Sequence, residues 1–254
     1  MTPRAELLER LLPIARAAGE AILRVYATDF GVRDKSDASP VTDADEQAEA
    51  LILIELATLT PEIPIVSEEA AAAGRIPDLA SQFWLVDPLD GTKEFVSRNG
   101  EFTTNIALIE EGRPVLGVVL VPAQDRLFAG ATGVGAFVED ESGRRAIACR
   151  TPPADGLTIV SSRSHGDAAA LDAFLAGRPV AAAVTAGSSL KFCLVASGEA
   201  DLYPRLGRTM EWDTAAGHAV LDAAGGRVSD VSGTELGYGK PGFENPHFVA
   251  EGLV

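Results

Sequence analysis

The chain has 254 residues, of which 46% are hydrophobic and 23% charged, a composition that excludes disordered and collagen-like chains and predicts a folded, soluble protein. Its 21 basic and 37 acidic residues give a formal net charge of −16. Such a surface repels nucleic acids and anionic membranes, and no basic cluster in the sequence offsets the repulsion. We therefore expect no nucleic-acid partner. The surplus carboxylates either keep the protein in solution or bind hard cations.

The N-terminal segment is predicted to be a core helix rather than a signal peptide. Its apolar residues recur at helical spacing between Leu7 and Ile22, and charged residues interrupt them too often for a signal core. No stretch approaches the roughly 18 uninterrupted apolar residues of a membrane span. Two cysteines, Cys149 and Cys193, cannot form a disulfide framework and favour a reducing compartment. We expect a cytoplasmic protein without a transmembrane segment, and peripheral association with an inner membrane stays open.

Residues 1–150 are expected to form an α+β domain. After a polar connection at 31–40, Thr42-Asp43-Ala44-Asp45 has the spacing of a capping box, with Thr42 as the N-cap of a helix that ends near Leu59. Apolar runs bounded by turn residues then predict short strands. These predicted strands cover residues 63–66, 83–86, 104–109, 115–121, 127–129 and 135–138.

Residues 151–254 are expected to form an α/β domain that begins after a proline-containing linker at 151–156. Strand and helix patterns alternate along this half, which is typical of α/β structure. The predicted strands cover 157–161, 180–185 and 200–203, and the predicted helices cover 167–175, 188–196 and 212–224.

Acidic residues gather where predicted strands end and helices begin. Asp87 and Asp90 directly follow a hydrophobic strand, Glu68 and Glu69 follow another, and Asp213 begins a helix. Taken alone, each group has an ordinary explanation. Asp87 and Asp90 suit a surface turn, Glu68 and Glu69 suit solvated side chains, and Asp213 suits an N-cap. Together they offer four or five oxygen ligands without a histidine or cysteine, which suits Mg²⁺ rather than Zn²⁺.

Three other catalytic or metal-binding motifs fail on spacing. The DxxD spacing of Asp87 and Asp90 differs from the DxD of haloacid dehalogenase-type phosphatases. Ala48 occupies the position at which an EF-hand loop opened by Asp43 needs glycine. Residues 188–191 match the SxxK of penicillin-recognising hydrolases, yet no SDN or KTG triplet follows.

Three segments together resemble the inositol monophosphatase superfamily of Mg²⁺-dependent, lithium-sensitive phosphatases. They are Ser67-Glu68-Glu69, the run from Trp84 to Thr92, and the run from Trp212 to Gly217. Within the superfamily the chain looks like the CysQ-type 3'(2'),5'-bisphosphate nucleotidases. Further matching stretches follow in the same order over nearly the whole chain, at 39–45, 91–95, 105–109, 187–193, 201–205 and 245–248. The resemblance implies a layered αβαβα sandwich with the active site between its two halves.

The resemblance also implies that the carboxylates hold two or three Mg²⁺ ions and that a water attacks the phosphate. Asp45 and Thr92 would form the dyad that orients this water and takes its proton. Two cations together can clamp the attacking and leaving oxygens of a phosphoryl transfer. The metal ligands implied by the resemblance are Glu68, Asp87, the carbonyl oxygen of Leu89, Asp90 and Asp213, with Glu69 near a weaker third ion.

Substrate contacts follow from the same resemblance. Lys191 and Arg205 would supply charge-assisted hydrogen bonds to the 5'-phosphate of a nucleotide. Arg208 departs from the proline expected at its position in this subfamily. The residues implied to surround the substrate are Gly91, Thr92, His165, Ser188, Lys191, Arg205 and Asp213.

The predicted function is hydrolysis of the 3'-phosphate of 3'-phosphoadenosine 5'-phosphate (PAP) to AMP in sulfur metabolism, with its sulfated relative PAPS as a second substrate. One alternative keeps the chemistry but acts on inositol 1-phosphate or a sugar phosphate. Another class of alternative is a nucleotide sensor without turnover, against which the Asp45 and Thr92 pair argues. The sequence is compatible with either a monomer or a homodimer.

Overall fold

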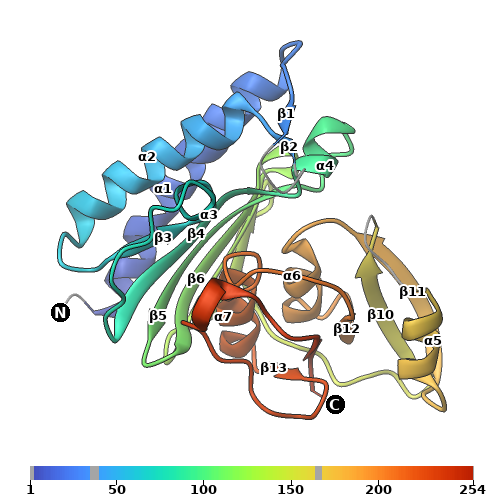
Figure 1. Ribbon diagram of the computed structural model, residues 1–254. Helices are drawn as coiled ribbons and strands as arrows, with labels where there is room; N and C mark the ends of the chain where they lie inside the picture. The colour runs from blue at the N-terminus through green and yellow to red at the C-terminus, as the bar shows by residue number, and fades with distance from the viewer. Residues whose placement is uncertain (1–2, 35–39, 164–167, 254) are drawn as a thin grey trace.

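The computed structural model describes residues 3–34, 40–163 and 168–253, which fold into five layers (Figure 1). Two helices cover one face of a seven-stranded sheet, and two more lie between this sheet and a five-stranded sheet. A further helix packs on the outer face of the second sheet. The predicted αβαβα order is therefore confirmed. No helix within the described residues is long and apolar enough to cross a membrane.

The outer layer consists of α1 (Arg4–Tyr26) and α2 (Asp43–Leu59), which pack on each other and on the large sheet. The predicted capping box at the start of α2 is confirmed. The backbone N–H of Ala44 donates to Thr42 Oγ1 at 3.2 Å, and that of Thr42 donates to Asp45 Oδ2 at 2.7 Å. The connection between the helices contains the short pair β1 (Arg33–Asp34) and β2 (Pro40–Val41).

The seven-stranded sheet has its strands in chain order, and only its first pair is parallel. Its strand β4 runs four residues beyond the predicted end, and the last strand and the short helix α3 (Glu68–Ala72) were not predicted. The short helix α4 (Thr92–Val96) begins directly after Gly91. The strands are β3 (Ile65–Ser67), β4 (Gln82–Asp90), β5 (Thr103–Glu110), β6 (Arg113–Val121), β7 (Arg126–Ala131), β8 (Gly135–Asp140) and β9 (Gly143–Ile147). A 3₁₀ turn, Pro122–Gln124, joins β6 to β7.

The middle layer contains α6 (Leu190–Ala196) and α7 (Ala215–Ala223). Helix α7 lies directly against the large sheet because Gly117 of β6 has no side chain. A Cβ atom there would lie 2.3 Å from the carbonyl oxygen of Ala216. This close approach brings the start of α7, and Asp213 just before it, to the end of strand β4.

The five-stranded sheet has the order β11-β10-β12-β14-β13, and α5 (Ala168–Leu175) packs on it through Leu171 and Phe174. Strands β13 and β14 were not predicted. The strands are β10 (Leu157–Ser162), β11 (Val180–Ala186), β12 (Leu202–Arg205), β13 (Arg227–Asp230) and β14 (Phe248–Glu251), with a 3₁₀ turn at Pro241–Phe243. The domain boundary at residue 150 lies between β9 and β10, and the division into two domains stays a prediction.

Candidate active site

A β-bulge at the end of β4 directs two aspartates to one face of the sheet. Residues three apart in a regular strand point to opposite faces. In this sheet Asp87 pairs with Asn105 and Asp90 pairs with Thr103, so β4 contains one more residue than β5 between the two pairs. The extra residue compensates for the odd spacing. The DxxD spacing that looked like a surface turn thus becomes a pair of carboxylates facing the same side.

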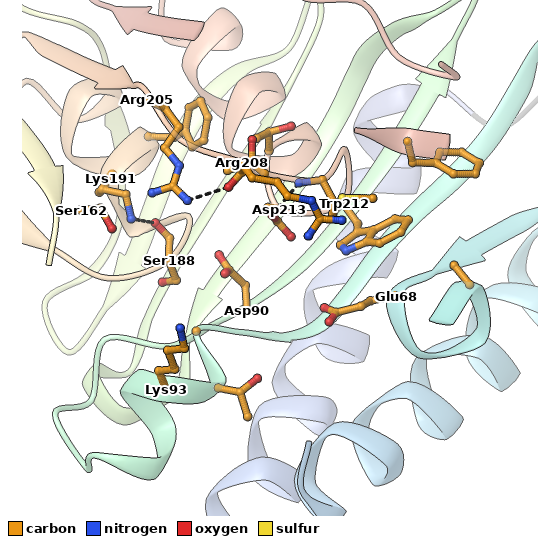
Figure 2. A pocket seen from close by; sticks show the side chains of 18 of the residues that line it. Glu68, Asp90, Lys93, Ser162, Ser188, Lys191, Arg205, Arg208, Trp212 and Asp213 are labelled. Atoms are coloured by element: carbon orange, nitrogen blue, oxygen red, sulfur yellow. Dashed lines mark hydrogen bonds between the residues drawn. The ribbon is translucent and has the colours of Figure 1, made fainter. Parts of the chain in front are cut away.

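Three carboxylates from distant parts of the chain meet at this bulge. Ligand oxygens of Glu68, Asp87 and Asp213 all lie within 4.8 Å of one another. Glu68 begins α3 directly after β3, whereas Asp213 precedes α7 on the other side of the sheet's end. Asp90 lies outside this group of three but lines the same cavity as Glu68 and Asp213 (Figure 2).

The electrostatics of this cluster favour a bound cation. Burial raises the pKa of Asp213 well above its usual range, and the neighbouring carboxylates of Asp90 and Glu68 raise it further. Burial also raises the pKa of Asp90, against the opposing effect of Lys191. Like-charged groups brought together in a low-dielectric site hold their protons unless a positive charge compensates them. A cluster of oxygen donors without nitrogen or sulfur ligands fits a hard cation such as Mg²⁺.

Ser189 connects the two halves of the acidic site, and the sequence analysis missed it. Its backbone N–H donates to Asp90 Oδ2 at 2.7 Å, and its hydroxyl donates to the carbonyl oxygen of Asp213 at 2.6 Å. Met210 N–H fixes the Asp213 side chain by donating to Oδ2 at 2.8 Å. A serine next to a predicted substrate contact, Ser188, carries no signal of its own in the sequence.

The predicted dyad is brought together at the start of α4. Thr92 Oγ1 lies 3.5 Å from Asp45 Oδ1, the long limit of a hydrogen bond. The other oxygen of Asp45 accepts hydrogen bonds from the backbone and hydroxyl of Thr42, so the capping box holds this carboxylate in place. Gly91 precedes Thr92 with a φ of 88°, in the left-handed region that favours glycine. Leu89 contributes a carbonyl oxygen to the same turn, 3.4 Å from Thr92 Oγ1.

A cavity of about 610 Å³ opens over these groups and has an acidic floor and a basic wall (Figure 2). We define the acidic floor as Glu68, Asp90 and Asp213, which line the cavity, together with Asp87, which is 1% exposed and meets Glu68 and Asp213 without lining the cavity itself. We define the basic wall as Lys191, Arg205 and Arg208. Lys93, Ser162 and Ser188 also line the cavity, as do Trp212 and Phe243.

The cations of the basic wall are held largely by backbone carbonyl groups. Lys191, which is 3% exposed, donates through Nζ to the carbonyl oxygens of Ser188 and Ala186. Burial lowers the pKa of Lys191 to about 8. Arg205 Nη2 donates to the Arg208 carbonyl at 2.8 Å, and among the described residues its buried Nε finds no acceptor. Arg208 is largely exposed and forms a 3.2 Å ion pair with Glu244. Buried cations with spare donors beside a cavity are suited to an anionic ligand.

One predicted residue, Glu69, does not join these groups, and the placement of another is not described. His165 lies outside the described residues. Glu69 is next to Glu68 but belongs neither to the three-carboxylate group nor to the cavity lining found among the described residues. A further residue was missed, because Glu49 of α2 accepts a hydrogen bond from Ala70 N at 3.0 Å and so anchors the helix that begins with Glu68.

The fold and the acidic site define a member of the inositol monophosphatase family, and the chain belongs to it: the model of the "Inositol monophosphatase family" matches residues 4–252. The chain is similar to the 3'(2'),5'-bisphosphate nucleotidase CysQ of Escherichia coli strain K12, with 47% identity over 247 residues, which are 95% of this chain and 98% of that protein. CysQ of Salmonella typhimurium is 49% identical over the same shares of both chains.

Solved structures agree with this assignment. CysQ from Bacteroides thetaiotaomicron, described as a bacterial member of the inositol monophosphatase family, superposes with a TM-score of 0.82 at 36% identity, covering 98% of each chain. Inositol monophosphatase from Anabaena superposes with a TM-score of 0.77 at 26% identity, covering 99% of this chain and 92% of that one. The predicted fold class and family are therefore confirmed.

Proposed function

We propose that this protein is a Mg²⁺-dependent 3'(2'),5'-bisphosphate nucleotidase that hydrolyses PAP to AMP and phosphate. The observation that carries the proposal is the single cavity in which the acidic floor faces the basic wall. A nucleotide with two phosphates needs one site for reaction and another for the remaining anion, and this cavity offers both. The CysQ relatives at 47% and 49% identity are named 3'(2'),5'-bisphosphate nucleotidases, which supports this proposal.

The acidic floor is assigned to the metal ions. Its carboxylates, of which Asp87 is buried and the others half-buried, and the absence of soft ligands among them fit Mg²⁺. When bound, the ions would supply positive charge to the reacting phosphate and acidify water at neutral pH. We assign two ions, or three if Glu69 takes part. Their ligands would be Glu68, Asp87, the carbonyl oxygen of Leu89, Asp90 and Asp213.

The protein's own residues would then place the water and the substrate. Thr92 Oγ1 orients the attacking water, and Asp45, 3.5 Å from that hydroxyl and 1% exposed, receives the proton through it. Such positioned proton transfer accelerates reactions by about 10²–10⁴-fold. Gly91 lets Ser188 and Glu101 approach the turn before Thr92, since a Cβ atom there would lie 3.3 Å from Ser188 Cβ and 3.5 Å from the Glu101 carbonyl oxygen, and it stays a predicted contact of the reacting phosphate.

The basic wall is assigned to the 5'-phosphate. Lys191 and Arg205 offer charged donors on the side of the cavity away from Glu68 (Figure 2). Ser188 lies between this wall and the acidic floor, where it would contact the ribose, and His165 stays a predicted contact. We also place the enzyme in the cytoplasm, because both of its cysteines are free and buried.

Phosphate release from PAP, PAPS and inositol 1-phosphate, each with Mg²⁺ and with a chelator, tests this proposal. We expect Mg²⁺-dependent release from the nucleotides and much slower release from inositol 1-phosphate. A preference for inositol 1-phosphate would keep the metal assignment and refute the assignment of the basic wall. Binding of PAP without release from any substrate would refute the catalytic assignment and support a sensor.

A further inference from the structure

Residues 187–189, which we call the bridging turn, lie between the acidic floor and the basic wall. The backbone N–H of Ser189 donates to Asp90 Oδ2 at 2.7 Å, and the carbonyl oxygen of Ser188 accepts a hydrogen bond from Lys191 Nζ. Figure 2 shows Ser188 between Lys191 and Asp90. A shift of this turn would therefore move a proposed Mg²⁺ ligand and a proposed phosphate contact together.

The bridging turn has a backbone conformation that needs support from its neighbours. Ser188 has a φ of 46°, in the left-handed region that is unfavourable for a residue with a side chain. Gly187 has no room for a side chain, since a Cβ atom there would lie 2.6 Å from the Glu101 carbonyl oxygen. Such a conformation persists only where surrounding contacts hold it in place.

Glu101 supplies two of these contacts from the large sheet, where it lies two residues before β5. Its Oε2 atom accepts a 2.9 Å hydrogen bond from the Gly187 N–H, and its carbonyl oxygen accepts a 2.8 Å hydrogen bond from the Ser188 hydroxyl. The N–H of Glu101 donates to Asn99 Oδ1 at 2.9 Å, which holds the backbone of Glu101 itself. One residue of the first half of the chain thus binds two consecutive residues of the second half.

Arg163 orients the Glu101 carboxylate toward the bridging turn. This arginine follows β10 and donates through Nε and Nη2 to the two carboxylate oxygens, each at 2.8 Å. Its Nη2 atom also donates to the Thr185 carbonyl oxygen at 3.1 Å. The Arg163 guanidinium lowers the pKa of Glu101, so this carboxylate is ionised at neutral pH. A bidentate pair of this kind fixes the orientation of both partners.

We propose that Glu101 is a positioning residue, which holds the bridging turn so that the Ser189 N–H fixes Asp90 for Mg²⁺ binding. Glu101 is not among the described residues that line the cavity, so it acts through the turn and not on the substrate. This inference rests on the metal assignment of the proposed function. Groups that orient metal ligands contribute about 10- to 100-fold to metal affinity, and for Glu101, one step further away, we expect about tenfold.

Calorimetric titration of the full chain with Mg²⁺, without substrate, tests the proposal. Glu101→Ala should weaken Mg²⁺ binding by about tenfold. Glu101→Gln removes the negative charge but keeps an oxygen that can accept from the Gly187 N–H, so its Mg²⁺ affinity should stay near that of the unmodified chain. This variant separates positioning from simple attraction of the cation.

The matched control is Glu139→Ala. Glu139 also pairs with arginines, Arg16 and Arg144, and its side chain is 19% exposed against 18% for Glu101. It does not belong to the described cavity lining. Its loss should lower stability and leave the Mg²⁺ affinity unchanged.

Amide hydrogen exchange in the metal-free chain measures the bridging turn directly. Glu101→Ala should speed exchange at the Gly187 and Ser189 amides, whereas Glu139→Ala should not. Glu101→Asp keeps the charge but withdraws it by one methylene, and it should show smaller changes of the same kind. It replaces the alanine variant if that variant does not fold.

The outcomes separate this proposal from the proposed function. An unchanged Mg²⁺ affinity in Glu101→Ala, or an equal loss in Glu101→Gln or Glu139→Ala, would overturn the positioning role. If the unmodified chain binds no Mg²⁺ and hydrolyses no PAP, the proposed function fails instead. Exchange at the Ser189 amide then decides alone whether Glu101 holds the bridging turn, and an unchanged rate in Glu101→Ala would refute it.

Discussion

The acidic floor and the basic wall face each other across one cavity, yet the protein holds them in opposite ways. The acidic floor brings like charges together in a buried place, and burial, followed by the neighbouring carboxylates, raises the pKa values of Asp90 and Asp213. The basic wall instead surrounds Lys191 and Arg205 with backbone carbonyl oxygens that accept their hydrogen bonds, and the Asp90 carboxylate compensates part of the Lys191 charge. The floor thus lacks a full set of compensating cations, whereas the cations of the wall are already hydrogen-bonded and keep donors for an anion. This difference predicts that substitutions in the floor affect turnover and those in the wall affect substrate affinity.

The largest effect is expected for Asp213→Asn. Losing one metal ligand at the reacting phosphate should lower kcat by on the order of a thousandfold or more. In chelator the same substitution should raise the thermal midpoint by a few degrees, because it removes one of several crowded, buried carboxylates. Phosphate-release kinetics and thermal melts with and without Mg²⁺ measure both effects. Asp172→Asn on the exposed side of α5 is the control, and an unfolded Asp213→Asn variant would contradict this account.

Thr92→Val should have the next largest effect. It removes the hydroxyl that links the water to Asp45, and about 10²-fold in kcat should be lost while KM stays within a few fold. Thr92→Ser should restore most of the rate, since it keeps the oxygen. Thr58→Val in α2 controls for the loss of a threonine hydroxyl elsewhere. Equal losses in the serine and valine variants would mean that Thr92 acts only through packing.

Arg205→Gln should change affinity rather than turnover. Losing a charged hydrogen bond to the 5'-phosphate costs about 1.5–3 kcal/mol, which raises KM for PAP roughly 10- to 100-fold. The KM for 3'-AMP, which lacks that phosphate, should hardly change. Arg113→Gln removes an exposed arginine that pairs with Glu235 far from the cavity and is the control. A similar rise in KM for PAP and for 3'-AMP would show that Arg205 does not act through the 5'-phosphate.

The sequence was most informative about the parts of the site that local rules determine. The capping box predicted where Asp45 lies, and the hydrophobic run before Asp87 predicted a buried strand. Spacing alone could not reveal the bulge that turns Asp87 and Asp90 to one face, because the bulge depends on the register with β5. Nor could it reveal Ser189, whose importance comes from two residues about 99 and 24 positions away in the chain.

The same limit applies to the second sheet. Strands β13 and β14 escaped prediction, and their length of four residues does not explain this, because the equally short β12 was predicted. They nevertheless complete the sheet that supports Arg205 on β12, which pairs with β14 at Phe248. The acidic floor was therefore predictable from motifs, whereas the support of the basic wall emerges only from pairing between distant segments.

The smallest expected effect is the pH dependence of the KM for PAP. It is also the most specific test of the difference between the acidic floor and the basic wall. Burial lowers the pKa of Lys191 to about 8, so the free enzyme carries this charge below pH 8 and loses it as the pH rises further. The KM for PAP should therefore rise above pH 8, by at most tenfold per pH unit, while kcat follows other groups. Lys191→Arg keeps its charge throughout this range and should flatten the rise. If the KM rises equally in the unmodified enzyme and in Lys191→Arg, the titrating group belongs to the acidic floor or to the substrate. Lys191 would then not be the residue through which the basic wall sets substrate affinity.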